Sequence, residues 1–213
     1  MVETTTEVFV DHVEHSIGGF GGHAFRRATH VTMAIIPYLY YVHGNDISSY
    51  FQLAPNQFVS LVCISILIIE ALRLRFGIVI IGQREYESYQ ISALAWGALA
   101  VSLALLIAPQ KGELMEAGLY GAPIIFGMTI VDPVMGEIKR IKQDLRLAIG
   151  IGLLVSYVVW LSCYYWLGTD LIVVALLAPL TVAGELPKTK AIDDNATMIL
   201  FPLTGLILMF PFL

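Results

Sequence analysis

Charged residues are scarce in this sequence, since Asp, Glu, Lys and Arg make up only 14% of its 213 residues. Hydrophobic residues make up 57%, and the mean hydropathy is +0.77. A chain this apolar has more apolar surface than the core of a water-soluble protein can bury, so we expect it to be embedded in lipid. Its length suits one bundle of several membrane-spanning helices rather than two separate domains.

Cysteine is also nearly absent, because the chain has only two. Cys63 and Cys163 both lie in apolar runs, which excludes a disulfide framework and a cysteine metal site. The segment Met1 to Asp11 lacks the basic and apolar regions of a signal peptide, so we expect the whole chain to be mature. The net charge of -5 comes from acids spread over loops and the N-terminal tail, which predicts no nucleic-acid partner.

Long apolar runs are what the sequence does have, and a spanning helix needs roughly 20 such residues. These runs predict an all-α, polytopic transmembrane helix bundle of about seven spans. The stretch Phe76 to Gly82 is apolar but too short to cross, so we expect an interfacial or buried turn there. The predicted spans are Thr29–Val42, Gln57–Leu72, Gln90–Ala108, Leu114–Val131, Leu147–Leu167, Leu171–Ala183 and Thr197–Leu213.

The segment before the first predicted span mixes apolar and charged residues. Glu7 to Ile17 has the pattern of a surface helix that lies along the membrane interface. The glycines between Gly18 and Gly22 are expected to break that helix as a flexible hinge. We therefore divide the chain into an interfacial segment, residues 1–25, and a transmembrane domain, residues 26–213.

Basic residues sort almost completely to one membrane face. Successive loops of a seven-span bundle alternate between the two faces, and Lys111 alone falls on the second one. The positive-inside tendency makes the first face cytoplasmic, with the N-terminus inside and the C-terminus outside. The basic residues of this face are Arg26, Arg27, Arg73, Arg75, Arg84, Lys139, Arg140, Lys142, Arg146, Lys188 and Lys190. Nine acids share it, namely Glu70, Glu85, Glu87, Asp132, Glu137, Asp144, Glu185, Asp193 and Asp194.

Two groups of residues on this face carry arginine. Arg26 and Arg27 lie one helical turn before His30, and paired guanidiniums suit phosphate oxygens, although the same residues could be a plain cytoplasmic anchor. Glu70 and Arg73 have the spacing of an ion pair on one helix face. That pair is either a structural contact at the membrane edge or a support that holds a phosphate-binding arginine.

A third group surrounds Asp132, which precedes a proline and is flanked by glycines that permit close approach of a ligand. Lys139 and Arg140 follow it. Carboxylate and phosphate oxygens are natural ligands of Mg²⁺, so Asp132 is a candidate metal ligand. The alternative is that a helix ends at Asp132 and a basic loop follows it.

The fourth group is the strongest chemical signal, because Asp193 and Asp194 are adjacent and repel one another unless a cation or a donor compensates. Glu185 precedes them in the same loop and Asn195 follows them. An acidic turn that caps the last span is the alternative, since Asp and Asn are good N-caps.

Together these motifs resemble the CTP-dependent polyprenol kinase family, which includes dolichol and phytol kinases and is related to phosphatidate cytidylyltransferases. The resemblance covers the chain from Arg26 to about Pro202, and Asp193-Asp194-Asn195 followed by Phe201-Pro202 is its most specific part. The chain departs from the family between Val131 and Leu147. There the family's Gly-Asp segment is reduced to Asp132 with its neighbours, and its Lys-Ser/Thr-x-x-Gly segment has no clear counterpart.

The resemblance implies a membrane kinase that transfers the γ-phosphoryl group of CTP, or of ATP, to an isoprenoid alcohol. Mg²⁺ would be held by Asp132, Asp194 and Glu185, with Asp193 as a further catalytic carboxylate. Phosphates would be bound by basic and polar residues: Arg26, Arg27, His30, Arg73, Lys139, Arg140 and Asn195. The host membrane would be a plasma membrane or an ER-type membrane. Two alternatives are a cytidylyltransferase that makes a CDP-lipid and a non-catalytic lipid-binding relative.

Overall fold

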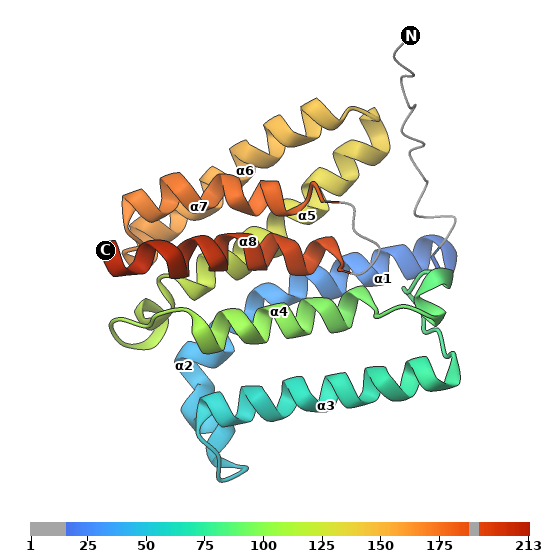
Figure 1. Cartoon of the computed structure of the whole chain (residues 1–213), viewed down its shortest axis with the longest axis horizontal. Helices are drawn as coiled ribbons and strands as arrows, with labels where there is room; N and C mark the ends of the chain where they lie inside the picture. Colours follow the sequence, from blue (N-terminus) through green and yellow to red (C-terminus); the bar gives the residue numbers. More distant parts are fainter. Residues whose placement is uncertain (1–15, 188–191) are drawn as a thin grey trace.

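A computed structural model describes residues 16–187 and 192–213, and this part of the chain is almost entirely helical (Figure 1). Its only β-type pairing is an isolated bridge between Ser16 and Arg84. Short 3-10 helices occur at Met33–Ile35, Glu85–Ser88, Leu114–Gly118 and Phe210–Phe212. The α-helices are α1 (Gly19–Thr32), α2 (Ile36–Ser49), α3 (Pro55–Phe76), α4 (Ala93–Ile107), α5 (Gly121–Lys142), α6 (Leu145–Leu167), α7 (Leu171–Gly184) and α8 (Asp194–Met209).

The lengths of the helices support a membrane protein. Among the described residues, Pro55–Phe76, Gly121–Lys142, Leu145–Leu167 and Asp194–Phe212 form four helices long and apolar enough to cross a bilayer. Helices α4 and α7 are apolar but shorter. The all-helical architecture is thus confirmed, whereas the number of seven spans stays a prediction.

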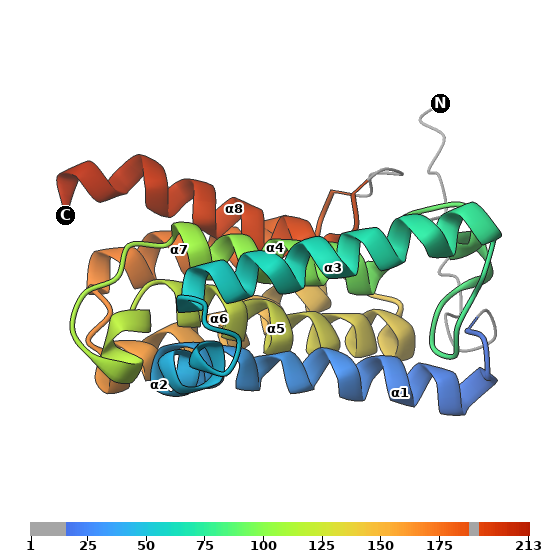
Figure 2. The ribbon, with the colours of Figure 1, turned by 90° about the horizontal axis from the view of Figure 1, so that it is seen from below.

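Helix α5 lies at the centre of the bundle and packs against α6, α8 and α1 (Figure 2). Its residues Ile124, Met128 and Val131 are completely buried in the common core.

The neighbouring helices α6 and α7 are joined by a polar contact as well. The Ser156 hydroxyl donates to the Ala178 carbonyl over 2.7 Å. This contact joins the middle of α6 to the middle of α7.

The first predicted span is wrong in its position. Helix α1 begins at Gly19 rather than Thr29, and the chain then turns through a 3-10 segment into α2, which runs across the end of the bundle (Figures 1 and 2). The predicted flexible hinge is wrong for the glycines after Gly18, because they lie inside α1. Gly18, with φ at +89°, starts α1, and a Cβ at Gly22 would lie 2.0 Å from the Ile17 carbonyl oxygen. The predicted surface helix Glu7–Ile17 falls mostly on residues 1–15, outside the described residues.

Helix α5 also differs from the prediction, because it does not end at Asp132. It continues through Pro133 to Lys142. A proline inside a buried helix is tolerated when neighbouring helices and side chains compensate the lost hydrogen bond. The helix ends where Gln143 adopts a left-handed conformation, with φ at +50°. Asp132 and Lys139 therefore lie seven residues apart on one helix face, instead of in a helix and a loop.

The stretch from Phe76 to Gly82 does not cross the bundle, as predicted. Helix α3 ends at Phe76, and Gly77 closes it in the left-handed conformation, with φ at +62°. The residues that follow have no regular structure, and Ile78 and Ile81 are exposed. This segment returns the chain towards the first residues of α1, where the Ile17 amide donates to the Gln83 carbonyl over 2.8 Å.

Candidate metal and phosphate site

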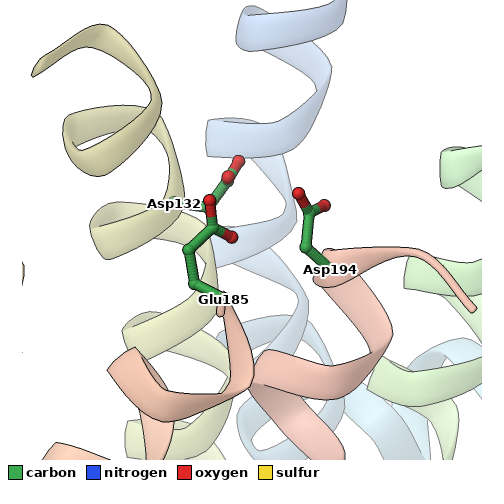
Figure 3. Close-up of side chains that lie close together, drawn as sticks. All are labelled: Asp132, Glu185 and Asp194. Atoms are coloured by element: carbon green, nitrogen blue, oxygen red, sulfur yellow. The ribbon is translucent and has the colours of Figure 1, made fainter. Parts of the chain in front are cut away.

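Three carboxylates from different parts of the chain lie close together (Figure 3). Asp132 comes from the middle of α5, Glu185 directly follows α7, and Asp194 is the first residue of α8. One oxygen of each lies within 4.8 Å of the others. Residues far apart in sequence thus form one group, called here the acidic cluster. Helix α1 passes close to it (Figure 3).

Glu185 is the buried member of the acidic cluster. Its Oε1 accepts a hydrogen bond from Lys139 Nζ over 2.5 Å, whereas its Oε2 is buried without a partner among the described residues. Burial raises the pKa of this carboxyl well above its usual range, and the negative charges of Asp194 and Asp132 raise it further. A buried carboxylate oxygen without a donor is expensive, so this atom calls for a cation or a proton.

The first turn of α8 holds the other polar groups. Asp193 is the N-cap, and its side chain accepts a hydrogen bond from the Asn195 amide over 3.1 Å. The predicted capping role of this turn is therefore real, and the same residues also face the acidic cluster. Burial raises the pKa of Asp193 to about 8, with a further contribution from the charge of Asp194. The Asn195 side chain is buried, and its Oδ1 has no partner among the described residues.

Cationic and polar groups of α1 contact the same cluster. Arg27 Nη1 lies 3.3 Å from Asp132 Oδ2, and His30 Nε2 lies 3.5 Å from the same oxygen. The imidazole also contacts the Met128 carbonyl at 3.2 Å. Together with Lys139, these groups place positive charge or hydrogen-bond donors beside the carboxylates, which is the composition expected where phosphate and a metal meet.

Arg26 connects the cluster to a carboxylate that the sequence motifs do not single out. Its Nη1 lies 2.7 Å from Glu87 Oε1, and its charge also acts on Asp193. Glu87 is buried, and it additionally accepts hydrogen bonds from the backbone amides of Arg84 and Ala93. The signal that could have found it is an acid in the loop directly before an apolar helix, where it caps the first turn.

The Glu70 and Arg73 pair holds α3 to α4. The guanidinium donates to both oxygens of Glu70, over 2.9 and 2.8 Å, and to the carbonyls of Ile78 and Gln90. Glu70 Oε1 in turn accepts a hydrogen bond from the Ser92 amide over 2.6 Å. This arrangement favours the structural alternative for both residues. Phosphate binding by Arg73 stays a prediction, and none of these contacts supports it.

Arg140, like Arg73, forms an ion pair with a carboxylate outside the acidic cluster. It pairs with Glu137, one turn earlier on α5, on the exposed surface of the helix. The predicted residues that do gather are therefore Asp132, Glu185 and Asp194, the adjoining residues of the α8 turn, and three donors: Arg27, His30 and Lys139.

The acidic cluster can hold a divalent cation. Mg²⁺ binds oxygens at about 2.1 Å, so two oxygens on opposite sides of one ion lie about 4.2 Å apart. The three carboxylate oxygens lie within 4.8 Å of one another, so a movement of less than about 1 Å brings them into range. The unpartnered Glu185 Oε2 is the atom that such an ion would satisfy. The residues present therefore fit the predicted metal.

Comparison with known proteins does not assign the chain to a family or a fold. No protein-family model, curated protein or solved structure matches this chain. The kinase-family resemblance of the motifs therefore stays a prediction, and the function has to be argued from the site itself.

Gly136 lets Arg27 reach Asp132, which gives a first prediction. A Cβ at position 136 would lie 2.4 Å from Arg27 Nη2, at the end of a flexible side chain. Gly136→Ala should therefore displace the guanidinium while changing the free energy of unfolding by less than about 1 kcal/mol, because the ion pair is partly exposed and alanine favours the helix. We expect the KM for nucleotide to rise about tenfold in a steady-state assay.

The matched control for Gly136→Ala is Gly150→Ala, since Gly150 lies in α6 and a Cβ added there would meet no atom within 4 Å. Its KM should stay unchanged. If Gly136→Ala also left the KM unchanged, the result would contradict the predicted role of Arg27 in binding phosphate.

The raised pKa values predict how stability depends on pH in the absence of divalent cations. The folded-state pKa of Asp193, about 8, lies above its unfolded value, so its contribution is present at low pH and is lost as the pH rises through about 8. Thermal unfolding in detergent with a chelator should therefore show a melting temperature that falls as the pH rises from about 4 to about 8. Mg²⁺ should reduce this fall.

Asp193→Asn keeps a good N-cap and removes the titrating group, so its melting temperature should vary less with pH. A wild-type melting temperature that rises over the same range with the chelator present would contradict the assigned burial of these acids.

Proposed function

We propose that the chain is a membrane kinase that transfers the γ-phosphoryl group of a nucleoside triphosphate to an isoprenoid alcohol. One observation carries the proposal. Carboxylates from α5, α7 and α8 meet around an unpartnered buried oxygen, with Arg27, His30 and Lys139 beside them. Phosphoryl transfer needs mainly positioning and charge neutralisation, and this group of residues can supply both.

The position of the site suits two reactants from different phases. The cluster lies where α7 ends and α8 begins, beside the middle of α5 (Figure 1). An alcohol dissolved in the bilayer has its hydroxyl at the interface, and a nucleotide arrives from water. In the proposed topology the cluster faces the cytoplasm, because the basic residues gather there.

In the proposed mechanism, Asp132, Glu185 and Asp194 would hold a divalent cation, which would neutralise charge on the phosphates. Arg27 and Lys139 contact phosphate oxygens and orient the γ-phosphoryl group. The alcohol oxygen attacks the γ-phosphorus, and the bond to the β-phosphate oxygen breaks, so a nucleoside diphosphate leaves. The alcohol proton passes to Asp194, which is the carboxylate of the three most open to solvent and can release it there.

Analysis of products tests the proposal. Purified protein is incubated with Mg²⁺, labelled CTP or ATP, and lipids that include prenols from farnesol to dolichol, diacylglycerol and phosphatidate. A prenyl monophosphate together with a nucleoside diphosphate is the expected result. Pyrophosphate with a CDP-lipid would replace the kinase by a cytidylyltransferase. No product and no saturable binding of Mg²⁺-nucleotide would overturn an enzymatic function.

A further inference from the structure

A groove opens beside the acidic cluster, and its lining includes Arg26, His30 and Asn195, three of the residues that the sequence predicts to bind phosphate. Its walls are α1, the segment 80–83 and the first residues of α4, and it encloses about 70 Å³. His30 and Asn195 line its inner part. Since His30 Nε2 lies 3.5 Å from Asp132, the inner end of the groove borders the cluster.

The inner end of the groove is polar and lacks one hydrogen bond. Asn195 is only 6% exposed, and its Oδ1 has no partner among the described residues. A buried amide oxygen in this state calls for a donor from outside the described residues. A hydroxyl group meets the requirement, because it can donate to the amide while its oxygen stays free to react.

The outer part of the groove is apolar. Phe25 and Ile81 line it and are 57% and 64% exposed, and Leu94 is 45% exposed. In a bundle embedded in a membrane, exposed apolar side chains beside charged residues such as Arg26 lie at the interface, where they contact lipid. The groove therefore leads from the lipid phase to a polar end that borders the carboxylates, which is the path that a lipid with a terminal hydroxyl requires.

The size of the groove limits what it can hold. Sites for whole cofactors usually measure about 300–1,000 Å³, so a volume of about 70 Å³ is too small for a nucleotide. It can take the hydroxyl end of one slim chain. A diacylglycerol has two ester-linked chains next to its hydroxyl and is too bulky there for a volume of about 70 Å³.

We infer that this groove receives the reactive end of the alcohol, which enters from the bilayer between α1 and the start of α4, and that it selects single-chain primary alcohols over diacylglycerol. Asn195 positions the hydroxyl, and Phe25, Ile81 and Leu94 set the width of the entrance. The inference rests on the proposed function for its choice of substrate.

Photolabelling tests the groove without any chemistry at the phosphate site. The probe is a prenyl-length primary alcohol with a diazirine near its hydroxyl and an alkyne at its far end. Adducts are expected on residues 25–33, 80–83 and 93–94, and farnesol should suppress them whereas diacylglycerol should not. Adducts spread over other lipid-facing helices would overturn the inference.

Two variants sharpen the test. Leu94→Trp should fill the groove and reduce labelling roughly tenfold, whereas Leu154→Trp, on the exposed surface of α6, should stay within about twofold of the wild type. Leu94→Ala adds no bulk and should allow diacylglycerol to compete. Equal labelling of the two tryptophan variants, or no competition in Leu94→Ala, would contradict the assignment.

The outcome separates the groove from the kinase activity. Labelling of the groove without phosphoryl transfer would reject the kinase and keep the groove as a lipid-alcohol site. Phosphoryl transfer with labelling elsewhere, and with Leu94→Trp fully active, would keep the kinase and reject the groove as the site of the alcohol.

Discussion

Asp194→Asn is expected to reduce the Mg²⁺-dependent phosphorylation of a prenol by about 10²–10³-fold, the loss typical of removing one preorganised charge-stabilising group. Asparagine keeps the size of the side chain and can still begin a helix, so the protein should fold. The physical reason for the loss is that Asp194 is one of three carboxylates that meet around one point, and in the proposed mechanism it accepts the alcohol proton. Initial rates at saturating Mg²⁺ and nucleotide measure the effect.

Asp46→Asn is the matched control for Asp194→Asn. The Asp46 carboxylate is 81% exposed and pairs, among the described residues, with His43 at 3.9 Å, in α2, away from the acidic cluster. This variant should keep the wild-type rate. Full activity in Asp194→Asn would show that the role given to Asp194 is wrong, even if the protein proves to be a kinase.

Gly184→Ala is expected to lower the free energy of unfolding by about 3 kcal/mol, at the upper end of what overpacking usually costs. A Cβ at this position would lie 2.5 Å from the Thr197 carbonyl oxygen and 2.6 Å from the Met198 Cα, which belong to the backbone of α8. Backbone atoms cannot rotate away as a side chain does, so α7 and α8 must separate. Unfolding with a denaturing detergent measures the loss.

The same separation should reduce activity, because Gly184 precedes Glu185 directly and the contact between α7 and α8 brings Glu185 to Asp194. The Thr197 hydroxyl also donates to the Gly184 carbonyl over 2.5 Å, which ties the two helices at this point. Gly150→Ala, where the added carbon meets no atom within 4 Å, is the control and should be neutral or slightly stabilising. Equal stabilities of Gly184→Ala and Gly150→Ala would contradict the described packing.

Hydropathy is enough to predict the interiors of the later helices. The predicted span Leu147–Leu167 matches α6, and Leu171–Ala183 matches α7 to within one residue. These helices are bounded by residues with a local effect, such as Asp144, which caps α6 by accepting a hydrogen bond from the Leu147 amide over 3.0 Å. Where the ends depend on local chemistry, the sequence alone predicts them.

Helix ends that depend on tertiary contacts could not be predicted in this way. Helix α1 starts ten residues early at a point where the Ile17 backbone is hydrogen-bonded to Gly82 and Gln83, in the loop before α4, and no local rule contains that contact. Helix α5 continues past Pro133 because it is buried among other helices, which overrides the tendency of proline to end a helix. Both errors come from contacts between distant parts of the chain.

The residues that form the candidate site are easier to predict from the sequence than the ion pairs that surround it. Asp132, Glu185 and Asp194 stand out in the sequence because adjacent or membrane-edge acids need a compensating partner, and the structure brings them together. The sequence could not show that Arg73 is fully engaged in joining α3 to α4, or that Glu87 pairs with Arg26. Those pairings depend on how the loop between α3 and α4 folds back over α1.

The central claim is that the acidic cluster holds a divalent cation. Titration of Mn²⁺, followed by electron paramagnetic resonance in detergent-solubilised protein, tests this claim most directly. We predict one saturable site that Mg²⁺ displaces and that disappears when Asp132, Glu185 and Asp194 are together replaced by their amides. Identical Mn²⁺ binding by the wild type and this triple variant, with both proteins folded, would contradict it.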